Sequence, residues 1–68
     1  MKMRPGYGNF LTGKRIEKGL TVKQLSEKTG IPERNISNIE LEKKGWSWYD
    51  LDRYRKGLDI PLSEVVYD

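Results

Sequence analysis

Residues 30–40 have the sequence GIPERNISNIE. Gly30 and Pro32 disfavour regular structure at its start, and most of the side chains that follow can form hydrogen bonds. If the segment is helical, Ile36 and Ile39 share one face, because residues three apart lie on the same side. The other face then carries a carboxylate, a guanidinium, a hydroxyl and a carboxamide. These groups match the major-groove edges of DNA: a guanidinium pairs with guanine, a carboxamide with adenine, and a carboxylate accepts from cytosine. This candidate base-reading surface, here called the reading face, comprises Glu33, Arg34, Ser37 and Asn38; the alternative is a polar face that is merely solvated.

Two predicted helices with a short turn between them must position the reading face. Thr21 is a good N-cap and Gln24 completes a capping-box pattern, so a helix begins there. Gly30 ends that helix, because glycine takes the left-handed C′ conformation at little cost. Pro32 suits the first position of the next helix, which is predicted over residues 32–42. Two helices joined by a glycine-containing turn of about three residues are typical of a helix-turn-helix.

This helix pair needs a core to hold it. Ser26 is small enough to stand where the two helices cross, and the branched residues Ile31, Ile36 and Ile39 anchor the second helix. In the first helix of the pair, the residues expected to face the core recur at positions i, i+3, i+4 and i+7. These positions are Val22, Leu25, Ser26 and Thr29.

A further helix is predicted upstream. Asn9 can cap a helix over residues 10–18, and Gly19 stands where a C′ glycine would end it. Gly13 weakens this helix by roughly 1 kcal/mol relative to alanine, so tertiary packing must hold it. Residues 1–8, punctuated by proline and glycine, are predicted to be a flexible basic arm.

Two more helices are predicted downstream. Ser47 followed by Asp50 is another capping signal, for a helix that runs to about Gly57, and Pro61 opens a short fifth helix. No segment shows the alternation of a strand. The sequence therefore predicts an all-α fold of five helices, in one domain over residues 9–68. The fourth helix has an apolar stripe of Trp48, Leu51, Tyr54 and Leu58.

The composition excludes several classes of protein. The 68 residues include no cysteine and no histidine, so neither a disulfide framework nor an ordinary zinc site is expected, and no cofactor. No nucleophile–base arrangement, phosphate loop or paired buried carboxylates are supported by the spacing, so no enzyme is expected. No apolar run approaches the about 20 residues of a membrane span, and the basic start lacks the apolar segment of a secretory signal. A cytoplasmic protein is expected.

The basic residues concentrate at the N-terminal end. Residues 1–20 carry five Lys or Arg against the single acid Glu17, whereas residues 21–40 balance and residues 41–68 have one acid in excess. A basic end on a near-neutral body suits a polyanionic partner on one face. The alternative is a basic surface that is merely solvated.

Residues 13–40, GKRIEKGLTVKQLSEKTGIPERNISNIE, resemble the DNA-binding domains of the Cro/C1-type (XRE) family of phage and plasmid repressors. The family-like words are RIEKGLT, QLSEKTGI and ISNIE, and a looser likeness continues through LDRYRKGLDIPLSEVV. The resemblance implies a five-helix, lambda-repressor-like fold. It also implies a transcriptional regulator, expected to be a repressor, that binds specific double-stranded DNA sequences. Helix 32–42 would lie in the major groove with its N-terminal half at the base edges.

The same resemblance implies roles for individual residues. Arg15 and Glu40 match a buried ion pair that ties the first helix to the third. Glu33 is an acid where neutral or basic residues are usual, so it either reads cytosine, rejects other sequences or caps the helix. Lys2 and Arg4 on the arm would reach a groove or the backbone. Contacts to the DNA backbone are expected from Thr21, Lys23, Asn35, Lys43 and Lys44.

Four features depart from the family pattern. Val22 stands where a DNA-contacting glutamine is common, and Ser26 stands where alanine is usual. The loop LEKKGW replaces a glycine-bearing tip after the third helix, so it has its own shape. Residues 46–49, WSWY, are unusually aromatic and serve either core packing or a patch for a partner.

The expected partner is a pseudo-palindromic DNA operator. One small module covers too few base pairs, so a homodimer on half-sites about 10 bp apart is expected. The alternative assembly is a monomer that acts with other proteins. The alternative function is a protein-interaction module on the same fold, such as an antirepressor or an antitoxin-like binder, but the polar reading face favours DNA. The dimer surface is expected on the last two helices, with Leu62, Val65, Val66 and Tyr67.

Overall fold

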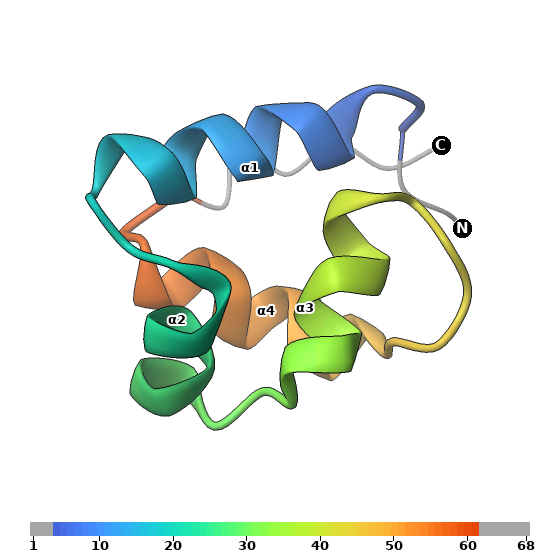
Figure 1. Ribbon diagram of the computed structural model, residues 1–68. Helices are drawn as coiled ribbons and strands as arrows, with labels where there is room; N and C mark the ends of the chain where they lie inside the picture. The colour runs from blue at the N-terminus through green and yellow to red at the C-terminus, as the bar shows by residue number, and fades with distance from the viewer. Residues whose placement is uncertain (1–3, 62–68) are drawn as a thin grey trace.

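The computed structural model describes residues 4–61. In Figure 1, α1 lies across the group formed by the other helices, and the contacts pair α1 with α3, α2 with α3 and α4, and α3 with α4. The all-α prediction is confirmed for these residues, which contain no strand. The predicted fifth helix and the predicted dimer surface lie beyond Pro61, outside the described residues. Within residues 4–61 the helices are α1 (Tyr7–Glu17), α2 (Val22–Thr29), α3 (Glu33–Glu40) and α4 (Trp48–Gly57).

Helix α1 begins three residues before the predicted start. Its N-cap is Gly6, whose φ of 87° is left-handed, and its first residue, Tyr7, is buried. The backbone N–H groups of Gly6 and Gly8 donate to the Glu42 carboxylate at 2.9 and 3.2 Å. The last two residues of the arm expected over residues 1–8 therefore belong to α1 instead. A local capping signal misplaced the boundary because the actual cap comes from a residue far along the chain.

The helix-turn-helix has the local structure that its sequence predicts. Thr21 and Gln24 form both hydrogen bonds of the capping box at the start of α2. Gly30 ends α2 with a left-handed φ of 80°. The Ser26 hydroxyl donates to the carbonyl oxygen of Ile31 at 2.5 Å, which ties α2 to the turn that leads into α3.

Helix α3 is shorter than the predicted range 32–42. Pro32 is its N-cap rather than its first helical residue, and Leu41 is its C-cap. Glu42 follows with a φ of 57°, in the left-handed region that favours glycine. The sequence prediction ran through Glu42 because glutamate is a good helix former, and nothing local indicates this reversal.

Helix α4 begins with the predicted capping box between Ser47 and Asp50. Its last residue, Gly57, packs against α2, since a β-carbon there would lie 2.5 Å from the Thr29 methyl group. The left-handed residue after α4 is Asp59, with a φ of 55°. Gly57 is therefore needed for close helix packing and not as a helix-ending residue.

The core draws side chains from all four helices and from the segments between them. Of the predicted apolar stripe of α4, Trp48 is partly exposed, at 37%. Trp46, from the loop before α4, packs against the core instead. Full burial of one such apolar side chain contributes about 1.5–3 kcal/mol. The core comprises Tyr7, Leu11, Leu25, Ile31, Ile36, Ile39, Leu51, Tyr54, Leu58 and Ile60.

Candidate nucleic-acid interface

Helix α3 separates an anchored face from an outward polar face. Ile36 and Ile39 on the inner face are fully buried. On the reading face, Glu33 and Arg34 in the first turn are exposed, and Ser37 one turn later is half-buried. The structure thus brings the predicted reading residues onto one side of a single helix. The most accessible charged groups lie at the N-terminal end of that helix.

Asn38 is the reading-face residue whose side chain is most involved with the protein itself. It is half-buried, and its Nδ2 donates to the carbonyl oxygen of Gly45 at 3.5 Å, a long hydrogen bond. Gly45 has a φ of 108°, and a β-carbon on it would lie 2.5 Å from Asn38 Nδ2. The carboxamide therefore packs against the loop between α3 and α4.

Asn35 lies on the flank of α3 that faces α4. Its Nδ2 donates to Asp50 Oδ2 at 2.9 Å. The same carboxylate oxygen accepts from the backbone N–H of Ser47 at 3.1 Å, within the α4 capping box. Asn35 was predicted as a DNA-backbone contact, but the structure engages its amide group between two helices. The sequence signal that was missed is the pairing of an amide in α3 with a capping carboxylate.

Arg15 and Glu40 lie in direct contact, with Arg15 Nε 2.7 Å from Glu40 Oε2 and Nη2 3.1 Å from Oε1. Arg15 Nη1 also donates to the carbonyl oxygen of Leu20 at 2.8 Å. Tyr54 is the third residue of this hydrogen-bond network, because its hydroxyl lies 2.5 Å from Glu40 Oε2. The sequence predicted Tyr54 only as part of an apolar stripe. The network joins α1, α3 and α4, and so fixes the orientation of the helix that carries the reading face.

The charges of this network are stable at neutral pH. Burial alone would raise the pKa of Glu40, but hydrogen bonds from Arg15 and Tyr54 outweigh it and lower that pKa below its ordinary value. The hydrogen bond to Glu40 likewise raises the pKa of Arg15. The pKa of the Tyr54 hydroxyl is raised well above its usual range, mainly by burial and secondly by the adjacent Glu40 carboxylate. Tyr54 therefore stays protonated and able to donate.

The predicted backbone-contact residues lie on both flanks of α3. Thr21 and Lys23, at the start of α2, are exposed, and so are Lys43 and Lys44 in the loop after α3. Figure 1 shows α2 and this loop on opposite sides of α3. A helix in the major groove has one DNA strand on each side, so this placement offers polar groups to both backbones.

Comparison with known proteins adds one finding to this geometry. A family model described as helix-turn-helix (HTH_3) matches residues 13–65, which is most of the chain. The chain belongs to this helix-turn-helix family. The match confirms the resemblance to the Cro/C1-type (XRE) domains. No curated protein and no solved structure matches the chain significantly.

Membership of the helix-turn-helix family assigns this chain to the DNA-binding transcriptional regulators, a family that is generally not enzymatic. The matched range includes the whole reading face and both flanks of α3. None of the helices within residues 4–61 combines the length and the apolar character needed to cross a membrane.

The aromatic segment 46–49 of this helix-turn-helix domain is divided between core and surface. The Trp46 and Trp48 rings meet edge to face, with centroids 5.0 Å apart. Tyr49 is 64% exposed, and the Arg53 guanidinium lies 4.2 Å from its ring centroid. Core packing holds for Trp46, whereas Trp48 is partly exposed and Tyr49 is largely exposed.

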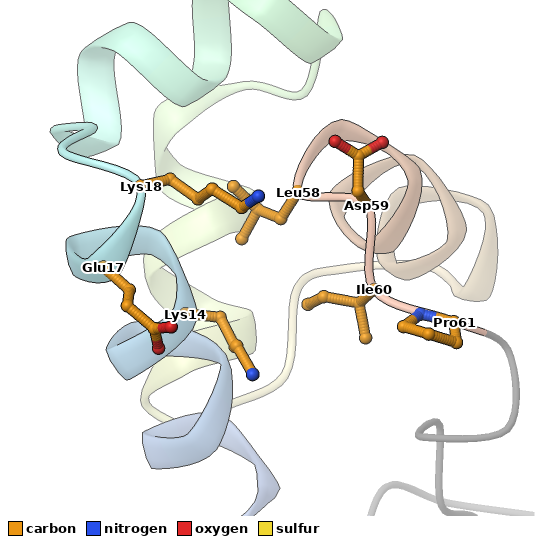
Figure 2. Close-up of a pocket in the computed structure, with 7 residues that line it drawn as sticks. All are labelled: Lys14, Glu17, Lys18, Leu58, Asp59, Ile60 and Pro61. Carbon is orange, nitrogen blue, oxygen red and sulfur yellow. The ribbon is translucent and has the colours of Figure 1, made fainter.

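A shallow pocket lies between α1 and the segment after α4 (Figure 2). Its charged groups are two lysines and two carboxylates, so it shows no preference for an anion. No residue of α3 contributes to it, and the pocket is therefore separate from the nucleic-acid interface. Its lining residues are Lys14, Glu17, Lys18, Leu58, Asp59, Ile60 and Pro61.

Proposed function

We propose that this protein is a sequence-specific, Cro/C1-like transcriptional repressor that inserts α3 into the major groove of double-stranded DNA. The observation that carries the proposal is the division of α3. Its inner face is fixed by the core and by the Arg15–Glu40 pair, while Glu33 and Arg34 remain exposed at its N-terminal end. A recognition helix needs this combination of rigid support and accessible polar groups.

Base readout is assigned first to Arg34. Its guanidinium suits guanine O6 and N7, a bidentate contact worth about 1–3 kcal/mol of discrimination. Glu33 can accept from cytosine N4 and would reject bases that present an acceptor to it. Ser37 can bond to any base edge. Asn38 completes the reading face: the bond to Gly45 uses one of the two Nδ2 hydrogens, which leaves the other hydrogen and Oδ1 for adenine.

Contacts to phosphate fix the register of α3 in the groove. We assign these to Thr21 and Lys23 on one flank, and to Lys43 and Lys44 on the other, because all four are exposed. Asn35 is better described as a residue that holds α3 on α4, through its bond to Asp50, than as a phosphate contact.

The regulator is proposed to act in the cytoplasm as a two-fold dimer on a pseudo-palindromic operator. The sequence places the dimer contact on Leu62, Val65, Val66 and Tyr67, outside the described residues.

The function is tested by selecting duplex DNA from a random pool and titrating selected and random duplexes across salt concentrations. We expect affinity to fall steeply with salt, because phosphate contacts release counterions. Arg34→Ala should weaken binding to the selected duplex by about 1–3 kcal/mol and relax specificity at one position. Lys23→Ala is the matched control, since it should weaken selected and random duplexes alike and reduce the salt slope by about 1. Equal losses on both duplexes for Arg34→Ala would contradict base readout.

A second function is favoured by one observation. Trp48 and Tyr49 are both exposed in part, and Arg53 lies over the Tyr49 ring; these residue types are enriched in protein contacts. If no duplex binds even at low salt, a protein-interaction module on the same fold becomes the better assignment.

A further inference from the structure

Glu42 makes contacts that are unusual for a charged residue in a loop expected to meet DNA. It lies immediately before Lys43, and its carboxylate accepts hydrogen bonds from the backbone N–H groups of Gly6 and Gly8. One oxygen, Oε2, accepts both, at 2.9 and 3.2 Å. The side chain therefore attaches the start of the loop to the start of α1, more than 30 residues away in sequence.

The backbone of Glu42 is strained to make this contact. Its φ of 57° lies in the left-handed region, which is unfavourable for a residue other than glycine. A glycine would take this conformation freely but would bring no carboxylate. The packing around it is also tight, because a β-carbon on Gly8 would clash with the carbonyl oxygen of Glu40 and approach the Glu42 side chain. The surrounding structure thus holds Glu42 in one position.

The same loop is attached at two other points. Gly45 packs against the Asn38 carboxamide on α3, and Trp46 packs against the core. Between these attachments stand Lys43 and Lys44, both exposed. The loop is therefore fixed at its beginning and its end, and its two free cations project from the middle.

We propose that Glu42 is a positioning residue for DNA binding: its carboxylate, bound to the N-terminus of α1, holds Lys43 and Lys44 against the phosphate backbone beside α3. This inference rests on the proposed function. It assigns a supporting role to an acid that stands beside the phosphates and would on charge alone oppose binding. The role belongs to this chain's own loop, LEKKGW.

Two opposite expectations follow for Glu42→Gln. If only charge matters, removal of an anion near phosphate tightens DNA binding. A glutamine oxygen can accept the same two N–H bonds but holds them less strongly than a carboxylate oxygen does. If Glu42 positions the lysines, Glu42→Gln therefore loosens the loop, and part of the ordering of Lys43 and Lys44 must then be done at binding. The sign of the change in affinity separates the two.

The experiment measures binding of a fluorescently labelled duplex, selected by the wild-type protein, across salt concentrations. The variants are Glu42→Gln, the control Glu27→Gln on α2, and Lys43→Ala/Lys44→Ala with and without Glu42→Gln. We expect Glu42→Gln to bind about two- to fivefold more weakly, as for a weakened exposed charge contact. Its salt slope should fall by about 1. Once both lysines are absent, Glu42→Gln should have no further effect on affinity.

Glu42→Gly separates positioning from folding. It removes the carboxylate but also relieves the left-handed strain, so its thermal stability should exceed that of Glu42→Gln while its DNA binding stays weak. All affinities are compared at a temperature at which circular dichroism shows every variant folded. Equal or tighter binding by Glu42→Gln, or an undiminished effect after removal of both lysines, overturns the inference. Failure of the wild-type protein to bind any duplex is a different result, which overturns the proposed function and this inference with it.

Discussion

Glu40 shows how one side chain can set the orientation of a helix, here α3. Its carboxylate binds the Arg15 guanidinium at two atoms, and Oε2 also receives the Tyr54 hydroxyl. That hydroxyl also lies 3.0 Å from the Leu11 carbonyl oxygen, but its single proton favours the charged acceptor. A buried pair of this kind contributes more to orientation than to net stability, since desolvation offsets much of the attraction. Removal of one partner leaves an uncompensated buried charge.

The same carboxylate predicts a pH dependence of folding. The pKa of Glu40 is lower in the folded protein than its ordinary value of 4.5, so the folded state binds its proton less readily than the unfolded state. Its contribution is fully present above about pH 5 and is lost as the pH falls through the folded pKa. Urea unfolding of the wild-type protein should therefore give a free energy of unfolding that decreases below pH 5.

Glu40→Gln tests this assignment. The variant should be less stable at pH 7 by about 3 kcal/mol, because Arg15 is left without its charged partner, and its stability should change less between pH 5 and pH 3. Glu27→Gln, at an exposed position on α2, is the control and should keep the wild-type pH profile. An unchanged acid slope in Glu40→Gln would assign the acid sensitivity to other carboxylates, such as Asp52, whose pKa is also lowered by its neighbours Arg55 and Lys56.

At the scale of the helices, two glycines in α1 have opposite consequences. Gly13 is exposed, its φ is not positive, and a β-carbon there would meet nothing within 4 Å. Gly13→Ala should therefore stabilise the protein by about 1 kcal/mol and raise Tm by about 4–8 °C. Gly8→Ala is the matched control. It should destabilise the fold, because its β-carbon would clash with the Glu40 carbonyl oxygen.

Thermal unfolding followed by circular dichroism measures both glycine variants. Stabilisation by Gly8→Ala would mean that α1 and α3 can separate slightly at no cost. In that case the attachment of Glu42 to the start of α1 would also be less rigid than the structure indicates.

The helices that begin with local signals could be predicted from the sequence. The capping boxes at Thr21 and Ser47 each use two residues three apart, and both are present in the structure. The start of α1 and the end of α3 could not be predicted, since they depend on each other through Glu42 and Gly6. A boundary set by a contact between distant residues leaves no periodic or capping pattern in the sequence.

The candidate site divides in the same way. The outward residues of α3 follow from helical spacing, and Arg15 and Glu40 followed from the family resemblance. Tyr54 was missed as a polar partner because its spacing is that of a core residue, which it also is. Asn35 was assigned to DNA because a sequence does not reveal which polar side chains are satisfied internally.

At the scale of the whole molecule, the longest dimension of the protein can be compared with the length of DNA that the proposed operator spans. Residues 4–61 extend 29 Å along their longest axis, whereas two half-sites are separated by about 34 Å along DNA. If the protein binds such an operator, as proposed, one protomer covers about one half-site. We expect sedimentation to show two protomers on a full operator and one on a duplex that carries a single half-site. A single protomer on the full operator would favour the monomer that acts with other proteins.

The edge-to-face pair of Trp46 and Trp48 has a practical consequence. These are the only two tryptophans in the 68-residue sequence; Trp46 belongs to the loop that carries Lys43 and Lys44, and Trp48 begins the helix after it. Intrinsic tryptophan emission therefore reports on this one corner of the protein and on no other. One ring packs against the core while the other is partly open to solvent, so a ligand that covers the corner changes the emission without an attached dye. The molecule carries its own optical probe beside the surface proposed to touch DNA.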